Sequence, residues 1–147
     1  MSGAATALSR AEIDAILDAH FRAEVAGDVE ATLGTLADNI EHDVVGDPAG
    51  VLHGPKAVGV RYGNLFSNVS GGGHEVIRRL YGENFVVDDK IWTARVDGEL
   101  LGLPGRGRTI SVRILHVFEF ADDAITRENV WIDGAAAITQ LTATTTE

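Results

Sequence analysis

The residue best placed to do chemistry is a histidine in a strongly alternating segment. Between positions 109 and 120 every even residue is apolar except His116, and the odd positions include Thr, Ser, Arg and Glu. Side chains alternate between the two faces of a strand, so this pattern predicts a strand with His116 on its buried face. A single histidine there is also typical of an ordinary core residue, so the strand alone is weak evidence for a site.

A second histidine occupies the same kind of position on a predicted helix. His20 falls on the apolar stripe, seven residues after Ile13 and four after Ile16. A neutral imidazole donates a hydrogen bond with one nitrogen and accepts one with the other, so it suits both general-base catalysis and hydrogen-bond donation. Two imidazoles directed at one interior favour a functional pocket.

The segment 39–47 is rich in ionisable side chains. Strand alternation places His42 on one face and Asp43 on the other, and the sequence does not decide which of the two faces lines a pocket. A His–Asp metal site is an alternative, but the sequence has no cysteine and no compact ligand motif such as His-Glu-x-x-His. We therefore expect no metal and no cofactor.

Two later strands carry further candidates. Arg95 and Asp97 share one strand face, which is the pattern of a surface ion pair or, inside a pocket, of a proton-handling pair. Trp131 and Asp133 share a face of the last predicted strand and are candidates for lining its open end. Asp133 also directly precedes Gly134, where it is suited to cap a final helix.

The elements that must position these residues follow from caps, breakers and periodicity. Helices are predicted at about 10–27, 28–36, 54–69 and 134–141. Strands are predicted at about 39–45, 75–86, 88–98, 109–120 and 125–133, with turns at 88–89, 102–107 and 122–123. Helices first and an antiparallel meander second indicate an α+β fold, with helices packed on one face of a curved sheet.

Size and charge narrow the range of partners. The 147 residues suit one domain, which we place at 9–141 with flexible tails at 1–8 and 142–147. A net charge of −10 argues against nucleic acid, which requires concentrated Lys and Arg. The sequence also lacks a membrane-length apolar run and a signal-peptide pattern. We expect a cytoplasmic protein with a small hydrophobic partner or a second copy of the chain, and no membrane.

Several strings, in their order and spacing, resemble the SnoaL-like polyketide cyclases of the nuclear transport factor 2-like superfamily. The resemblance covers about residues 9–141. The strings are Ala26-Gly27-Asp28-Val29-Glu30, Leu36-Ala37-Asp38, His53-Gly54-Pro55-Lys56-Ala57, Gly102-Leu103-Pro104, Gly107-Arg108, His116-Val117-Phe118-Glu119-Phe120, Asp133 and Gln140-Leu141. The resemblance implies a cone of three helices on a curved, mainly antiparallel sheet, an interior pocket and a homodimer.

The resemblance also implies roles for particular residues. His116 matches the strand position of an active-site histidine in these cyclases, and His20 falls near the oxyanion-hole tyrosine of ketosteroid isomerases. The string 93–97 resembles the Arg-x-Asp strand of limonene-epoxide hydrolases. Where the cyclases and hydrolases carry an essential aspartate on the last strand, this chain has Val130. Either the base lies elsewhere, at Asp133, at Asp97 or within 42–43, or the family reaction is absent.

The leading hypothesis is cofactor-free acid/base catalysis on a small hydrophobic carbonyl compound, by aldol-type cyclisation or isomerisation. A carboxylate removes a proton next to a carbonyl, and His116, helped by His20, stabilises the enolate. The alternatives are a binding protein for an apolar ligand and an epoxide hydrolase. The residues expected to contact the ligand are His42, Asp43, Tyr62, Phe66, Arg95, Phe118 and Trp131.

Overall fold

The structure is a computed structural model that describes residues 7–144. Its helices are α1 (Arg10–Ala26), α2 (Val29–Leu33), α3 (Gly54–Asn68) and α4 (Gly134–Thr142). Its strands are β1 (Leu36–Val44), β2 (Leu52–His53), β3 (Val69–Gly82), β4 (Phe85–Val96), β5 (Glu99–Leu100), β6 (Leu103–Pro104), β7 (Arg108–Ala121) and β8 (Ala124–Ile132). None of these described helices is long and apolar enough to cross a membrane.

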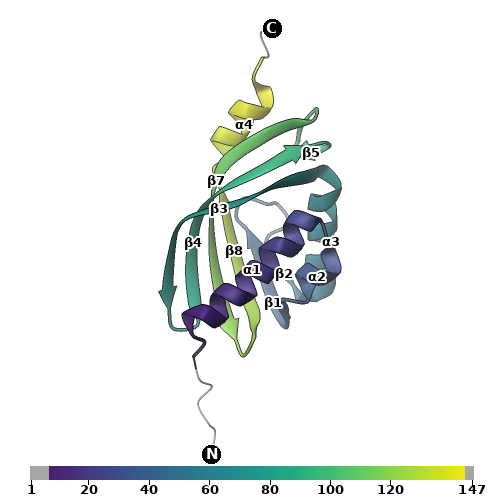
Figure 1. The fold of residues 1–147 in the computed structure, drawn as a ribbon. Helices are drawn as coiled ribbons and strands as arrows, with labels where there is room; N and C mark the ends of the chain where they lie inside the picture. The colour runs from purple at the N-terminus through teal and green to yellow at the C-terminus, as the bar shows by residue number, and fades with distance from the viewer. Residues whose placement is uncertain (1–6, 145–147) are drawn as a thin grey trace, which may run out of the picture.

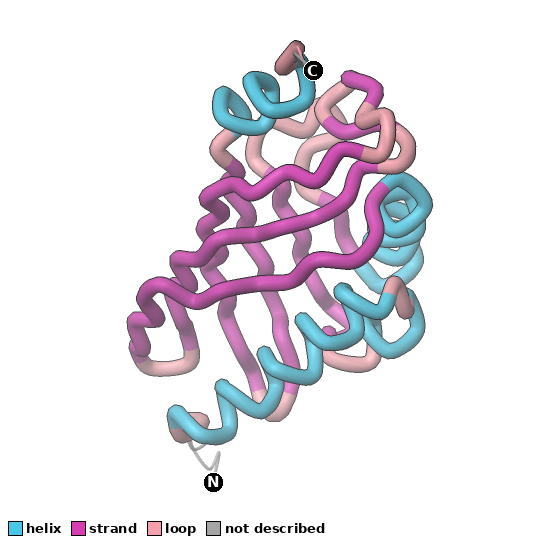
Figure 2. Tube along the Cα trace, turned by 45° about the horizontal axis from the view of Figure 1, so that its top comes forward, coloured by secondary structure: helices cyan, strands magenta, loops and turns pink. Residues whose placement is uncertain are grey.

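Six strands form one curved sheet in the order β2-β1-β8-β7-β4-β3. Strands β1 and β8 run parallel, and the other neighbours are antiparallel. Helix α1 runs along one side of the sheet, with α2 and α3 beyond its C-terminal end and α4 at the far end of the sheet (Figures 1 and 2). The predicted α+β fold of helices on a mainly antiparallel sheet is confirmed.

Local signals account for the helix boundaries. Helix α1 begins after Ser9, whose side chain accepts a hydrogen bond from the backbone N–H of Glu12. It ends at Gly27, which has a φ of 68° and so takes the left-handed conformation that suits glycine. Helix α4 begins after Asp133, whose carboxylate accepts from the N–H of Ala136. Asp133 is therefore a helix cap.

The predicted turn at 88–89 is wrong. Strand β4 runs straight through these residues, and the hairpin turn lies at Glu83 and Asn84 instead. Asp88 is fully buried, and Arg79 compensates for the burial by donating two hydrogen bonds to its carboxylate, at 2.9 and 3.0 Å. Aspartate is common in turns, so Asp88 suggests a turn when only its neighbours along the chain are considered. The partner that stabilises it in a strand, Arg79, lies on the neighbouring strand.

The glycine run 71–73 lies within β3, which begins at Val69, six residues before the predicted start at 75. Gly72 has a φ of +75°, and a Cβ at this position would lie 1.9 Å from the carbonyl oxygen of Thr93. Glycine is required here by the close approach of the β4 backbone.

A β-bulge separates the two ends of β8. Across the β7–β8 pair, Phe120 faces Ile125 and Glu119 faces Arg127, so Thr126 is an extra residue. Ile125 is buried, and the bulge then brings Glu128 to the same inner face. The inner face of β8 beyond the bulge is thus formed by even-numbered residues.

The described residues at the edges of the predicted tails 1–8 and 142–147 make contacts with the domain. Leu8 packs against the core and its N–H donates to the side chain of Asn84 at 3.2 Å. Thr142 is the last residue of α4, and Arg108 donates to the carbonyl of Ala143 at 2.8 Å. These residues belong to the packed domain, while 1–6 and 145–147 lie outside the described residues.

Candidate active site

A pocket of about 1170 Å³ opens between α1, α3 and the inner face of the sheet. Much of its wall is apolar, with side chains from β1, α3, β4, β7 and β8. Its polar lining includes six titratable side chains, those of Glu24, His42, Tyr62, His74, His116 and Glu128, and the pocket is also lined by Asp47, Arg61, Asn64, Asn68, Ser70 and Glu99. Such a pocket, apolar with a few convergent polar groups, is the usual form of a small-molecule site.

Glu128 is the centre of the polar wall, and its side chain is 1 % exposed. The hydroxyl of Tyr62 donates to its Oε2 at 2.7 Å. The Nε2 atoms of His20 and His42 each lie 3.5 Å from Oε2, and Nε2 of His116 lies 3.6 Å from Oε1. One carboxylate therefore gathers three imidazoles and a phenol from four different elements.

Glu128 is held as an anion. Burial alone would raise the pKa of this carboxyl group, but the positive charge of His20 and the hydrogen bonds from His20 and His42 hold the pKa well below its usual value of 4.5. A buried carboxylate is costly unless it is paired, and here the imidazoles and Tyr62 provide the pairing.

The proton positions on His20 follow from its neighbours. The hydroxyl of Thr35 donates to the carbonyl of Thr32 at 2.7 Å, so it must accept from His20 Nδ1, which is 2.7 Å away. Nε2 faces the oxygens of Glu24, Glu128 and Tyr62, at 3.5, 3.5 and 3.3 Å. The Tyr62 proton is used on Glu128, so all three oxygens are acceptors for an N–H.

His20 is accordingly protonated on both nitrogens. Burial alone would lower the pKa of His20, but the Glu128 and Glu24 carboxylates outweigh burial and raise it. The ring is fully buried and lies behind the pocket wall, which makes it the counter-ion of Glu128.

His42 has the other tautomer. Arg61 Nη1 lies 3.1 Å from His42 Nδ1, and a guanidinium group can only donate. Nδ1 is therefore the acceptor, and the proton sits on Nε2, which points toward Glu128 Oε2. Arg61 is itself fixed by the carbonyls of His42 and Gly50, each at 2.9 Å, and by Asp47 at 3.1 Å.

His116 is on the buried face of β7, as the alternation predicts, and it lies on the pocket wall. Its ring stacks on Phe118 with the centroids 5.1 Å apart and the planes 3° apart. Burial, with the charge of Lys90, lowers the pKa of His116 well below 6.5, so the ring is neutral. Among the residues described, Nδ1 of His116 has no hydrogen-bond partner.

His20, Glu24 and Glu128 are the one metal-capable group within 7–144, with one nitrogen and two oxygens all within 4.8 Å of one another. In the arrangement described, Nε2 of His20 carries a proton, and a metal ion would have to displace it to bind there.

The structure places the other candidates in different positions. Tyr62 and Phe66 line the pocket, and Phe118 packs behind His116. Asp43 points to the opposite face of β1, where Asn129 donates to it at 3.1 Å. Because neighbouring side chains of a strand point to opposite faces, Asp43 must face outward when His42 faces inward.

The Arg95–Asp97 pair lies outside the pocket. Its side chains are 61 % and 46 % exposed, with Nε of Arg95 2.7 Å from Oδ1 of Asp97. Ser70 also donates to Asp97, at 2.6 Å. The inner face of β4 is formed by the even-numbered residues, such as Ala94 and Val96, so the odd-numbered pair must face outward.

The two last-strand candidates are not on the pocket wall either. Trp131 is 40 % exposed on the outer face of β8, because Val130 and Ile132 take the inner positions. Asp133 caps α4, so its carboxylate is engaged by a backbone N–H. The buried carboxylate on the inner face of β8 is that of Glu128, two residues before Val130.

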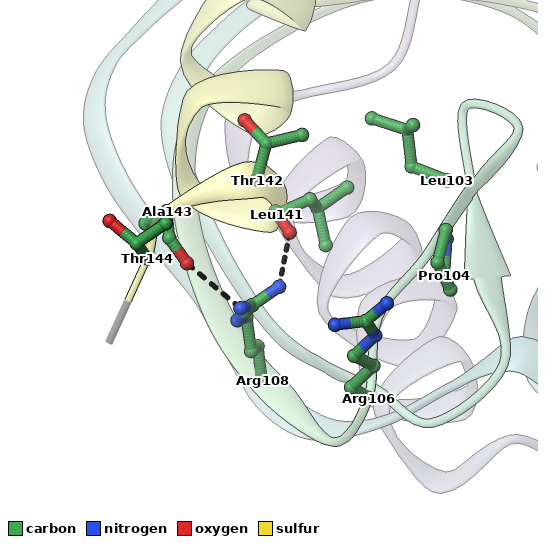
Figure 3. A pocket seen from close by; sticks show the side chains of 8 residues that line it. All are labelled: Leu103, Pro104, Arg106, Arg108, Leu141, Thr142, Ala143 and Thr144. Carbon is green, nitrogen blue, oxygen red and sulfur yellow. Dashed lines mark hydrogen bonds between the residues drawn. The ribbon is translucent and has the colours of Figure 1, made fainter. Parts of the chain in front are cut away.

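A second hollow, of about 450 Å³, lies between the β5–β6 hairpin and the end of α4 (Figure 3). Arg106 and Arg108 line it, and Arg108 donates to the carbonyls of Leu141 and Ala143. Arg108 thereby anchors the end of α4, and we assign it a structural role.

Glu24 and Glu128 are absent from the residues singled out in the sequence. Glu128 lies in a strand that alternates about Ile125, and this alternation assigns it to the outer face until the bulge is known. Glu24 lies four residues after His20, the helical spacing that places two side chains on the same side, and this was an available signal.

The fold and the polar wall define a pocket-forming α+β protein with buried acid/base groups. The chain matches the family model described as SnoaL-like polyketide cyclase over residues 16–141, and it belongs to that family. This membership supports a small-molecule function of the cyclase or isomerase kind. A comparison with curated proteins returned no match.

Solved structures share the fold at low identity. TsrD from Streptomyces laurentii is 22 % identical with a TM-score of 0.79, covering 93 % of this chain and 99 % of that one. An LEH-like epoxide hydrolase of M. tuberculosis is 16 % identical with a TM-score of 0.70, covering 89 % and 90 %. A protein of ketosteroid isomerase-like fold from Catenulispora acidiphila is 11 % identical with a TM-score of 0.71, covering 88 % and 93 %.

Proposed function

We propose that this protein catalyses cofactor-free enolisation of a small hydrophobic carbonyl compound, leading to aldol-type ring closure or to isomerisation. The observation that carries the proposal is the buried Glu128 carboxylate, which lies on the wall of an apolar pocket and is surrounded by hydrogen-bond donors. Glu128 removes the proton next to the carbonyl. The donors around it stabilise the enolate oxygen.

The low pKa of Glu128 limits the substrates it serves. A weakly basic carboxylate removes a proton efficiently only from an acidic C–H bond. Carbon atoms activated by two carbonyls, or by a carbonyl and an aromatic ring, meet this condition. A polyketide-like chain contains such positions, and a pocket of about 1170 Å³ accommodates a molecule of two or more rings.

Three neutral groups surround Glu128, and the protons that Tyr62 and His42 direct at its carboxylate become available to the enolate oxygen once Glu128 has taken the substrate proton. His116 presents a neutral ring at the wall, His42 is fixed with its proton on Nε2, and burial together with the Glu128 charge raises the pKa of Tyr62 well above 10. Neutral donors in a dry site stabilise a developing anion without a proton leaving the protein. Loss of one such donor costs about 10²–10³-fold in rate.

The alternatives have less support. A carboxylate lies 3.6 Å from the His116 ring, which favours catalysis over simple ligand binding. Epoxide hydrolysis rests on Arg95 and Asp97, and that pair is exposed outside the pocket.

The proposal can be tested without the natural substrate. The probes are 2-acetyl-1-tetralone and 2-phenyl-1-tetralone in D₂O, with deuterium uptake at the α-carbon followed by NMR. We expect the wild-type protein to accelerate uptake and Glu128→Gln to lower the rate by about 10²-fold or more. The matched control is Glu119→Gln, an exposed glutamate on the neighbouring strand. No acceleration of either probe by the wild type, or full activity in Glu128→Gln, would overturn the proposal.

A further inference from the structure

We infer that Glu24 is a second acid/base residue of this pocket, which exchanges protons with Glu128 through the Nε2 proton of His20. The inference rests on the proposed function, because it describes where the proton taken by Glu128 goes next. It adds a residue and a path that neither the fold nor the family membership assigns.

The first step is the shared proton. His20 and Glu24 are four residues apart on α1, so both side chains leave the helix on the same side. Glu24 Oε2 and Glu128 Oε2 each lie 3.5 Å from His20 Nε2. Since His20 Nδ1 is occupied by Thr35, the Nε2 proton is the one that both carboxylates can receive.

The second step is the state of Glu24 itself. Its side chain is 12 % exposed, it lies on the pocket wall, and its Oε2 is buried with no hydrogen-bond partner among residues 7–144. The titratable groups that act on it are His20 on α1, Glu128 on β8, Lys90 on β4 and His42 on β1. Burial raises the pKa of Glu24 to about 7, with His20 opposing the shift and Glu128 adding to it.

The resulting path balances. The carbon–hydrogen electron pair passes into the enolate as Glu128 takes the proton. His20 gives its Nε2 proton to Glu24 and receives the proton from Glu128 in its place. Glu128 is then an anion again, His20 is a cation, and Glu24 is a neutral acid at the pocket wall. Glu24 can return this proton to a different atom of the ligand or release it to water.

The first test reads the proton states directly and needs no ligand. We expect nitrogen-15 NMR to show His20 protonated on both nitrogens at pH 7, and carbon-13 NMR to show Glu24 titrating near pH 7 rather than near 4.5. In Glu24→Gln the titration of His20 should move, while Asp18→Asn, an exposed residue of the same helix, should leave it unchanged. A neutral His20 at pH 7, or an ordinary Glu24 titration, would overturn the inference.

The second test separates exchange of the removed proton from delivery of a proton to the opposite face. Resolved 2-phenyl-1-tetralone in D₂O reports opposite-face protonation by racemisation and solvent exchange by deuterium uptake. In Glu24→Gln we expect uptake to fall by at least about tenfold relative to racemisation, because the proton on Glu128 returns to the same face of the carbon before it exchanges, which changes neither the configuration nor the label. Glu24→Asp should restore part of the uptake. Equal effects on both rates would contradict the relay, whereas failure of the wild type to racemise the probe would contradict the proposed function and leave the NMR test decisive for the proton states.

Discussion

Nε2 of His116 lies 3.6 Å from Oε1 of Glu128, across two neighbouring strands of the sheet. The two residues are diagonal neighbours, since His116 is paired with Val130 and Glu128 with Phe118. This diagonal contact supplies the carboxylate that His116 lacks in its own strand. It also leaves the other carboxylate oxygen to Tyr62, His20 and His42.

Replacing Glu128 by Gln should destabilise the protein by about 3–5 kcal/mol at neutral pH, because the buried His20 cation loses its main partner. Urea unfolding measures this, with Glu119→Gln as the control.

The pH dependence of that difference has a defined sign. The pKa of Glu128 is lowered in the folded state, so its contribution is present above pH 4.5 and is lost as the pH falls through the folded pKa. The pKa of His20 is raised, so its contribution is present below pH 6.5 and is lost as the pH rises through the folded pKa. A difference independent of pH would contradict the ion pair.

Replacing Lys90 by Met should stabilise the protein at pH 7. Lys90 is fully buried, with its ammonium 3.2 Å from Asp88 and directly over the ring of Phe21. Burial lowers the pKa of Lys90 from 10.5 to about 8, although Asp88 opposes the shift. The buried charge therefore costs on the order of 3 kcal/mol, and Asp88 keeps Arg79 as its partner in the variant.

The advantage of Lys90→Met should depend on pH. It is largest below pH 8 and declines between pH 8 and 10.5, because a neutral lysine in both states carries no charge penalty. Unfolding curves at pH 7 and pH 10 provide the measurement, and a destabilised variant at pH 7 would show that the ammonium is favourable where it lies.

Replacing Arg61 by Met should release the tautomer of His42. The guanidinium fixes the proton on Nε2, so its loss allows protons on Nδ1 as well. Nitrogen-15 NMR of the histidine side chains distinguishes the two tautomers. Arg61→Lys keeps a donor and should retain more of the original tautomer, and Arg78→Met, an exposed arginine, serves as the control. A wild-type His42 with its proton on Nδ1 would contradict the assignment.

Replacing Asp97 by Asn should leave the rate of deuterium uptake unchanged. The carboxylate is 46 % exposed and bonded to Arg95 and Ser70, and although Ser70 lines the pocket, neither Asp97 nor Arg95 does. The same uptake assay used for Glu128→Gln provides the measurement. A large loss of activity would restore the Arg95–Asp97 pair as a candidate for the chemistry.

The sequence was sufficient for the features that depend on neighbours along the chain. The helix predicted at 10–27, the cap at Asp133 and the inward direction of His116 all follow from local spacing, and the structure agrees with them. His20 was identified for the same reason, because a polar residue on an apolar helical stripe is visible within two turns.

Features that depend on pairing between strands could not be predicted. Asp88 was assigned to a turn because its bond to Arg79 on β3 is invisible in the local sequence. The direction of the Asp43 side chain could not be predicted, because alternation separates the two faces of a strand without showing which one is buried. Glu128 was missed because its direction depends on where β8 pairs with β7.

The bulge at Thr126 works as a shift of reading frame within a strand. A strand keeps one frame, in which every second side chain enters the interior, and an inserted residue changes which set enters. Upstream of the bulge the frame delivers Ile125 to the core, and downstream it delivers Glu128 and Val130 to the pocket. The buried Ile125 and the charged Glu128 thus face the same interior from one strand only because of the extra residue. Deleting Thr126 would turn the side chains on one side of it to the opposite face, so the charge in the interior depends on this single residue.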